Sequence, residues 1–207
     1  MAERKTIVYP NPEVLAQAVA ARTLLTIIDL LAEPDRQRVD IAVTGGTDGI
    51  YVLKVMGESP LADAVDWRRV HVWWGDERFV AADDDDRNAK QAREAWFGKL
   101  IEDGLMPAGN IHEMPADGRD ADEIASASPE QTDAVLAAAA AEYQRELVEQ
   151  LGSEPALDIA MFGVGPIRSS GLNHFAMPER MQRSRSPSNT VRCSSFLLSF
   201  RFSQART

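Results

Sequence analysis

Apolar positions along the chain follow two spacings, and these alternate from the N-terminus to about residue 162. Short apolar runs rich in β-branched residues predict strands at residues 6–9, 39–43, 70–74, 111–114 and 157–162. Apolar positions at helical spacing predict helices at residues 12–31, 48–56, 88–101 and 132–151. Asn11 can cap the first helix, with Pro12 in its first turn, and we expect residues 115–128 to form a polar loop.

This alternation predicts an α/β fold with a mainly parallel sheet flanked by helices. The run at residues 39–43 suits a strand that is buried on both faces of such a sheet. Glycine-containing loops at residues 44–49, 75–78 and 163–166 each follow a predicted strand. Because ligands bind outside the carboxyl ends of parallel strands, we expect the three loops to meet at one edge of the sheet and to form the binding site there.

The pattern stops after Pro166, where composition and charge change together. Residues 167–207 contain seven Arg, no Lys, nine Ser and a single acidic residue, Glu179, which gives a net charge of +6. The whole chain carries −10, so residues 1–166 carry −16. We therefore divide the chain into a truncated α/β domain at 1–166, whose sheet is incomplete at the C-terminal end, and a divergent Arg/Ser-rich tail at 167–207 that we expect to be mostly disordered.

Composition narrows the choice of partners and compartment. A net charge of −10 argues against nucleic acid or an acidic membrane as the partner of the whole chain, but it permits a small anionic substrate. Cys193 is the single cysteine, which excludes an intramolecular disulfide and a cysteine-rich metal site. The N-terminal apolar stretch is too short for a signal peptide, and no run approaches the roughly 20 apolar residues of a membrane span. We expect a cytoplasmic protein, and the sequence does not indicate its oligomeric state.

The loop at Thr44, Gly45, Gly46 and Thr47 suits phosphate binding. Glycines let the backbone approach an anion closely, and the N–H groups at the start of the following helix can receive it. A tight strand-to-helix turn without a ligand is the alternative. The spacing matches neither the dinucleotide-binding fingerprint nor the P-loop, whose Lys is absent here.

Three charged residues, Asp76, Glu77 and Arg78, directly follow a strand that we expect to be buried. The planar fork of Arg78 can grip a phosphate, while Asp76 or Glu77 can orient Arg78 or hold a sugar hydroxyl. The alternative is a solvated loop with local ion pairs. Asn88 is a good cap for the next helix, and the acidic run at residues 83–86 is better explained as a solvated face than as a metal site.

The remaining candidate residues give weaker signals. Gly163 and Gly165 belong to the third glycine loop, which is not specific on its own. His71 and His112 lie in short apolar segments, which favours structural roles, and His174 lies in the tail. The spacing of the chain supports no Ser-His-Asp arrangement.

Four blocks taken together resemble the 6-phosphogluconolactonase family in order and spacing. They are Thr-Gly-Gly at 44–46, Val-Trp-Trp-Gly-Asp-Glu-Arg-Phe-Val at 72–80, Asp-Asp-Asp-Arg-Asn at 84–88 and Phe-Gly-Val-Gly-Pro at 162–166. The tryptophan-containing block and the following Arg-Asn are the specific part. The glucosamine-6-phosphate deaminases, a sister family on a similar fold, share the glycine loops and typically differ in the second block.

The resemblance implies a Rossmann-like α/β fold and hydrolysis of 6-phospho-D-glucono-1,5-lactone to 6-phosphogluconate, a step of the pentose phosphate pathway, without metal or cofactor. It implies that Arg78 binds the phosphate of this small sugar lactone and that Gly45 and Gly46 line the pocket. In the family a histidine acts as general base toward the attacking water, and donors near the carbonyl stabilise the oxyanion. The candidate substrate-binding residues are Thr44, Gly45, Gly46, Thr47, Asp76, Glu77, Arg78, Asn88, Gly163 and Gly165.

The chain departs from the family at that histidine. Where the family continues from Gly-x-Gly-Pro into Asp-Gly-His, this chain has Ile167, Arg168 and Ser169, and the family's later phosphate-binding Lys has no counterpart. His174 lies outside the motif and does not receive the role. We therefore expect impaired turnover, with a non-catalytic phosphosugar-binding remnant or a glucosamine-6-phosphate deaminase as alternatives and a basic-tail interaction module as the weakest interpretation. A shifted reading frame after Pro166 is our hypothesis for the origin of the tail.

Overall fold

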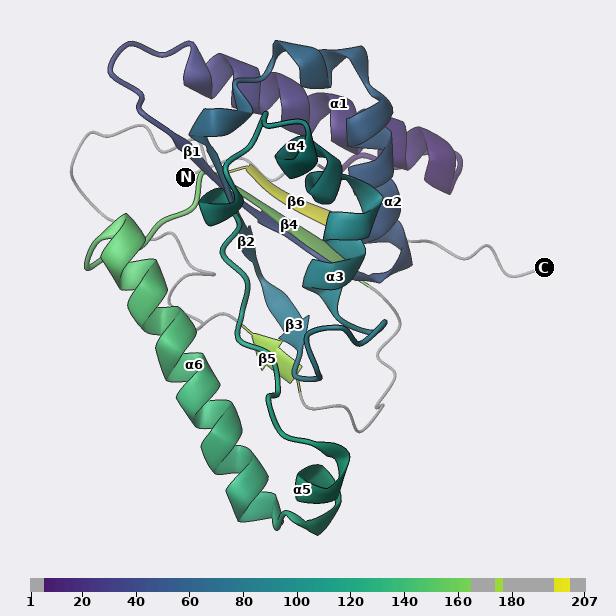
Figure 1. The fold of residues 1–207 in the computed structure, drawn as a ribbon. Helices are drawn as coiled ribbons and strands as arrows, with labels where there is room; N and C mark the ends of the chain where they lie inside the picture. The colour runs from purple at the N-terminus through teal and green to yellow at the C-terminus, as the bar shows by residue number, and fades with distance from the viewer. Residues whose placement is uncertain (1–5, 165–173, 177–195, 202–207) are drawn as a thin grey trace.

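The computed structural model describes residues 6–164, 174–176 and 196–201. Within them, a four-stranded parallel sheet has the order β2-β1-β4-β6 (Figure 1). The strands are β1 Val39–Val43, β2 Val70–Trp74, β4 Ile159–Val164 and β6 Phe196–Arg201. The prediction of an α/β fold with a mainly parallel sheet is confirmed.

β1 lies inside the sheet and all five of its residues are buried. Ile41 is paired with Val72 of β2 on one side and with Ile159 of β4 on the other. A strand in this position needs apolar side chains on both faces, which explains its nearly continuous apolar run. Asp40 is the polar exception, and its carboxylate accepts a hydrogen bond from the guanidinium of Arg38 at 2.6 Å.

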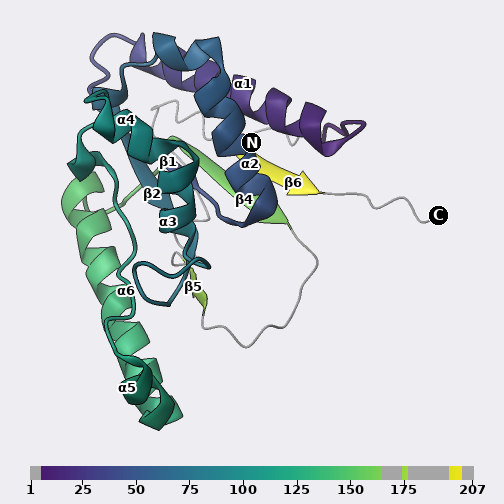
Figure 2. The same ribbon diagram turned by 45° about the vertical axis from the view of Figure 1, so that its right-hand side comes forward.

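Helices lie on both faces of the sheet. α1 (Pro12–Leu31), α2 (Gly46–Glu58) and a helical stretch at residues 88–102 lie on one side, and α6 (Pro129–Leu151) lies on the other (Figures 1 and 2). α1 begins as predicted, because Asn11 Oδ1 accepts a hydrogen bond from the N–H of Val14 at 2.8 Å and Pro12 occupies the first turn.

α1 is the one helix among the described residues that is long and apolar enough to cross a membrane, with a mean hydropathy of 1.7. Its apolar side chains have another use in this fold, because Val19, Leu24 and Ile27 are buried in the core. A core helix meets the same criteria of length and composition, so its hydropathy is accounted for by packing.

The predicted helix at residues 88–101 is continuous but not uniform. α3 (Asn88–Ala92) and α4 (Gly98–Glu102) are joined by a π-helical turn, η3 (Arg93–Phe97), that buries both Trp96 and Phe97. The ring of Trp96 packs edge-on against Trp67 with centroids 4.8 Å apart. It also excludes a side chain at Gly57 of α2, where a Cβ atom would lie 2.5 Å from the ring. Short 3-10 helices lie at η1 Pro60–Ala64, η2 Trp67–Arg69 and η4 Ala108–Asn110.

The polar segment before α6 contains a helix that we did not predict. α5 (Ala121–Ser126) begins at a capping box in which Asp120 accepts from the N–H of Glu123 and Glu123 accepts from the N–H of Asp120. A second capping box, between Ser128 and Gln131, starts α6 three residues before the predicted position, with Pro129 in the first turn. No residue of α5 is buried, so its sequence lacks the apolar periodicity on which the prediction depended.

Two predicted strands are wrong. Residues 6–9 have no regular secondary structure, and Ile7 and Val8 are exposed, because a run of strand formers needs a partner strand for its backbone groups. Residues 111–114 make one isolated bridge, between Ile111 and Val72. Next to it, the side-chain amide of Asn110 donates to the backbone oxygens of Arg68 and Val70 and takes the place of a longer ladder.

One further segment differs from prediction, and two short pieces of the tail form strands. Residues 75–78, predicted as loop, contain β3 (Asp76–Arg78), which pairs antiparallel with β5 (His174–Ala176). β5 and β6 belong to the tail that we expected to be mostly disordered, and β6 extends the sheet beside β4. The rest of that tail lies outside the described residues, as does Gly165.

Candidate functional site

The three glycine loops meet at the carboxyl edge of the sheet, as far as the structure describes them. Thr44, directly after β1, and Gly163, near the end of β4, line the same pocket. Gly75, directly after β2, packs against Phe162 of β4 so closely that a Cβ atom would lie 2.7 Å from its ring. The convergence expected from strand order alone is therefore confirmed for Thr44, Gly75 and Gly163.

The pocket at this edge is lined mainly by apolar side chains, with a few polar groups. Pro12 and Leu15 of α1, Tyr51 and Val52 of α2, and Met161 of β4 form most of the wall. Thr44 and Asp48 provide the polar atoms. Ligand pockets commonly combine apolar walls with a few polar groups that fix the orientation of the ligand.

β3 separates its three charged residues onto two faces. Successive side chains of a strand point in opposite directions, and here Glu77 is buried whereas Asp76 and Arg78 are half-buried. Asp76 and Arg78 therefore share the face that ligands can reach. The sequence alone had left Asp76 and Glu77 equivalent.

Glu77 does not share that face and has a structural role. Its carboxylate is 1% exposed and accepts hydrogen bonds from the backbone N–H groups of Arg78 at 2.8 Å, Asn88 at 2.7 Å and Ala89 at 2.9 Å. Two of these donors belong to the first turn of α3, so Glu77 caps a helix from a distant strand. Burial raises the pKa of Glu77, while the three N–H groups and the nearby Arg87 oppose that shift.

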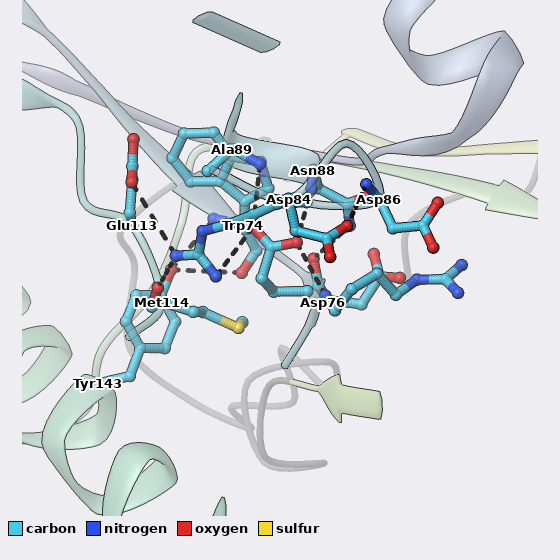
Figure 3. A network of polar contacts seen from close by, with 12 residues as sticks. Trp74, Asp76, Asp84, Asp86, Asn88, Ala89, Glu113, Met114 and Tyr143 are labelled. Carbon is cyan, nitrogen blue, oxygen red and sulfur yellow. Dashed lines mark hydrogen bonds and ion pairs between the residues drawn. The ribbon is translucent and has the colours of Figure 1, made fainter. Parts of the chain in front are cut away.

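Arg87 extends this buried network away from the site. Its guanidinium donates to the backbone oxygen of Met114 and lies 4.0 Å from the carboxylates of both Glu77 and Glu113. Figure 3 shows Glu113 and Met114 on one side of the network and Asp76 and Asn88 on the other. The Arg-Asn pair of the third sequence block is therefore used for different purposes, because Arg87 supports the core and Asn88 supports the loops.

Asn88 ties the first glycine loop to β3. Its Nδ2 donates to the backbone oxygen of Asp76 at 3.0 Å, and its Oδ1 lies where a side chain of Gly45 would be, 1.7 Å from the position of an added Cβ atom. Thr44 Oγ1 donates weakly to Asp76 Oδ1 at 3.4 Å. The prediction that Asn88 caps the next helix is wrong, because Arg87 occupies the cap position and Asn88 is the first residue of α3. The link of Asn88 to Gly45 was missed because no local pattern reports it.

The start of α2 is arranged to receive an anion. Gly45 occupies the cap position and contributes no side-chain hydrogen bond, so the first N–H groups of the helix have no side-chain cap. Gly46 has a φ of 76°, which is costly for residues with a side chain. Gly46 and Thr47 are exposed, and they lie at the same edge as Thr44.

Arg78 places a positive charge at this edge. Within the described part of the chain, its guanidinium makes no hydrogen bond or ion pair, and its Nε is buried without a partner. Other half-buried arginines near the sheet have carboxylates, as Arg36 has Asp158 at 2.6 Å and Arg38 has Asp40. A half-buried guanidinium without a carboxylate is suited to binding an anionic ligand.

The comparison with known families agrees with this geometry. Residues 10–166 match the family model described as glucosamine-6-phosphate isomerases/6-phosphogluconolactonase. The chain belongs to this family. The matched region ends at Pro166, where the charge of the sequence changes sign, and it includes all ten candidate residues.

The similar curated proteins carry the lactonase name. The chain is 34% identical over 165 residues to a 6-phosphogluconolactonase of Streptomyces coelicolor, covering 77% of this chain and 57% of that protein. It is 33% identical over 159 residues to one of Mycobacterium tuberculosis, covering 77% and 58%. The chain thus spans less than two thirds of the length of these relatives.

Solved structures support the fold. The 6-phosphogluconolactonase from Trypanosoma cruzi superposes with a TM-score of 0.60 at 24% identity, covering 79% of this chain and 59% of that one. The Thermotoga maritima enzyme gives a TM-score of 0.56 at 22% identity, covering 78% and 61%. Among the residues described here, no three His, Cys, Asp or Glu side chains are grouped closely enough to hold a metal ion.

Proposed function

We propose that this chain binds 6-phosphogluconolactone at the carboxyl edge of its sheet, as a 6-phosphogluconolactonase whose turnover is impaired. The observation that carries the proposal is Arg78, a half-buried cation on β3, just past the end of β2, with no carboxylate partner among the described residues. Family membership and the lactonase names of the similar proteins support this choice of ligand. A phosphorylated lactone supplies the anion that Arg78 lacks.

In this proposal different residues at the carboxyl edge of the sheet bind different parts of the ligand. Arg78 and the first N–H groups of α2, at Gly46 and Thr47, hold the phosphate. The Asp76 carboxylate accepts hydrogen bonds from the sugar hydroxyls, and the Thr44 hydroxyl donates a hydrogen bond to one of them. Gly45 and Asn88 hold these two groups at a fixed separation, and Gly163 lies beside the sugar.

Hydrolysis requires a base that takes a proton from the water attacking the lactone carbonyl. The family's Asp-Gly-His is replaced here by Ile167, Arg168 and Ser169. Loss of a general base costs about 10²–10⁴-fold in rate. We therefore propose that this chain binds the phosphosugar and turns it over slowly or not at all.

The test combines binding and turnover on the full chain. Titration calorimetry with 6-phosphogluconate, the reaction product, measures binding, and hydrolysis of freshly made lactone above the uncatalysed rate measures turnover. Arg78→Gln should weaken binding roughly 10–100-fold, the loss expected for charged hydrogen bonds. Arg68→Gln is the matched control, because Arg68 is exposed and already paired with Asp66 at 2.8 Å.

Each result has a definite meaning. Product binding that depends on Arg78, without turnover, supports the non-catalytic phosphosugar site. Rapid hydrolysis lost in Arg78→Gln overturns the proposed impairment, and no binding at all overturns the site. Release of ammonia from glucosamine-6-phosphate identifies the sister activity of the same family.

The partners and compartment follow from the ligand. A small phosphorylated sugar is a cytoplasmic metabolite, so we propose a cytoplasmic location. We propose no nucleic-acid or membrane partner, because the chain carries a net charge of −10.

A further inference from the structure

A chain of hydrogen bonds joins α6 to the opposite end of the sheet from the glycine loops. His112 lies beside β2 and is 4% exposed. Its Nδ1 is 2.6 Å from Glu146 Oε1 on α6, and its Nε2 is 2.9 Å from Nδ1 of His71 on β2. The two imidazole rings are nearly parallel, with an interplanar angle of 14°.

The carboxylate of Glu146 determines which imidazole nitrogens of His112 and His71 carry a proton. An ionised Glu146 can only accept, so the proton of a neutral His112 is on Nδ1. Nε2 of His112 must then accept, and Nδ1 of His71 must donate to it. This leaves Nε2 of His71 without a proton, so Glu146 fixes the tautomers of both histidines.

The surroundings hold this chain in place and supply the other charges that face it. The indole of Trp73 stacks on His112 with centroids 3.8 Å apart, and its Nε1 donates to Asp40 at 2.9 Å. From β1 and the residue before it, Arg38 and Asp40 face His71, and they are paired with each other at 2.6 Å. Asp158, before β4, contacts the N–H of Asp40 at 2.9 Å.

We propose that Glu146, His112 and His71 form a pH-sensitive latch that holds α6 on the sheet and opens on acidification. One added proton is compatible with the chain, because a single imidazolium still donates to its neutral neighbour. A second proton places N–H groups on both facing nitrogens, at 2.9 Å, and adds two like charges. The doubly protonated form therefore cannot keep this contact.

The latch lies beside the line of apolar contacts that α6 makes with the core, to which the partly buried Leu136, Ala140 and Leu151 also belong. In this 23-residue helix the buried residues are Ala139, Tyr143 and Leu147. In the sequence Glu146 lies between Tyr143 and Leu147. Its hydrogen bond to His112 therefore adds a polar contact where α6 buries few apolar side chains. Figure 1 shows α6 along one side of the body, with the end that bears α5 directed away from the sheet.

The direction of the pH effect follows from the unfolded state. Unfolded histidines protonate near pH 6.5. Burial, with Arg38 and His112, lowers the pKa of His71 to about 4, although Asp40 opposes the shift. A group with a depressed folded-state pKa stabilises fully above pH 6.5, and its contribution is lost as the pH falls from there toward 4.

Nuclear magnetic resonance of the imidazole nitrogens tests the latch directly, because the whole chain has three histidines. At pH 7.5 we expect both His71 and His112 as the Nδ1–H tautomer. Amide exchange should then show protection of residues 139–151 falling between pH 6.5 and 4 before protection of α1 falls. Tautomers with Nε2–H, or independent titration of both rings near 6.5, would overturn the proposal.

Two variants separate the latch from general acid unfolding. His71→Asn supplies a side-chain amide that can turn to donate to or accept from His112, so the loss of α6 protection should move by at least one pH unit toward acid. Glu146→Gln should scramble the His112 tautomer, and Glu149→Gln, exposed on the same helix, is its control. An unchanged acid transition in His71→Asn, with the variant folded at pH 7.5, contradicts the latch.

Discussion

Oε1 of Glu77 accepts the backbone N–H of Asn88 at 2.7 Å, which joins the strand of the candidate site to the helix behind it. The same carboxylate accepts from Ala89 through its other oxygen. Glu77 therefore fixes the start of α3, and through Asn88 it fixes the first glycine loop. Glu77, one of three adjacent charged residues in this block, therefore supports the site from behind and does not form its surface.

Replacement of Glu77 by Gln should be costly. The amide retains one acceptor but turns an NH₂ group toward backbone donors and leaves the buried Arg87 without one of its two carboxylate neighbours. We expect a loss of about 3–5 kcal/mol in the free energy of unfolding, the range for a broken buried pair. Urea unfolding measures it, and Glu94→Gln on the surface of η3 is the control. A loss under about 0.5 kcal/mol, a surface-like effect, contradicts the structural role.

The ionisation of Glu77 predicts a pH dependence with a definite sign. Burial raises its pKa in the folded protein above the usual value of 4.5. A raised folded-state pKa gives stability that is present below the unfolded pKa and is lost as the pH rises through the folded value. The unfolding free energy of the wild type should therefore fall with rising pH relative to a Glu77→Gln variant, and parallel curves would exclude this contribution.

Substitution of Gly45 by Ala should disturb the link between the loop and α3. The added Cβ atom would lie 1.7 Å from Oδ1 of Asn88, so one of the two must move. We expect a destabilisation of about 1–3 kcal/mol and weaker phosphosugar binding. Gly109→Ala is the control, because a Cβ atom there meets nothing within 4 Å. In a double-mutant cycle Asn88→Ala should relieve part of the cost, and strict additivity would show that the clash is absent.

Tyr143 holds α6 against the edge of β2. Its hydroxyl accepts from the backbone N–H of Trp74 at 3.0 Å and donates to the oxygen of the same residue at 3.3 Å. Tyr143→Phe leaves these buried groups without that partner and should cost about 1–3 kcal/mol. Tyr51→Phe, at an exposed tyrosine of α2, should change stability by less than about 0.5 kcal/mol in the same denaturant experiment.

We expect Arg78 to favour ligand binding at a cost to the stability of the unliganded protein. Its Nε is buried without a partner among the described residues, so Arg78→Gln should keep or raise the melting temperature of the unliganded protein. The same variant should lose the rise in melting temperature that excess 6-phosphogluconate gives the wild type. A large fall in the unliganded melting temperature would instead identify Arg78 as a structural residue.

Local patterns were sufficient for the elements whose signal is short-range. β1 was predicted because its five residues form a largely apolar run, and α1 because Asn11 and Pro12 mark its start. The meeting of the loops at Thr44, Gly75 and Gly163 followed from strand order, since parallel strands end at one edge. The four blocks of the sequence were sufficient to indicate the family.

The tertiary structure decided what depends on pairing between distant segments. Asp76 and Glu77 are chemically alike and adjacent, and only the seating of β3 against α3 places one at the surface and the other under a helix. The meeting of Gly45 with Asn88, and of His71 with Glu146 through His112, joins residues far apart in the chain. Periodicity reports which face of an element is buried, but the partner it is buried against is set by how the elements pack.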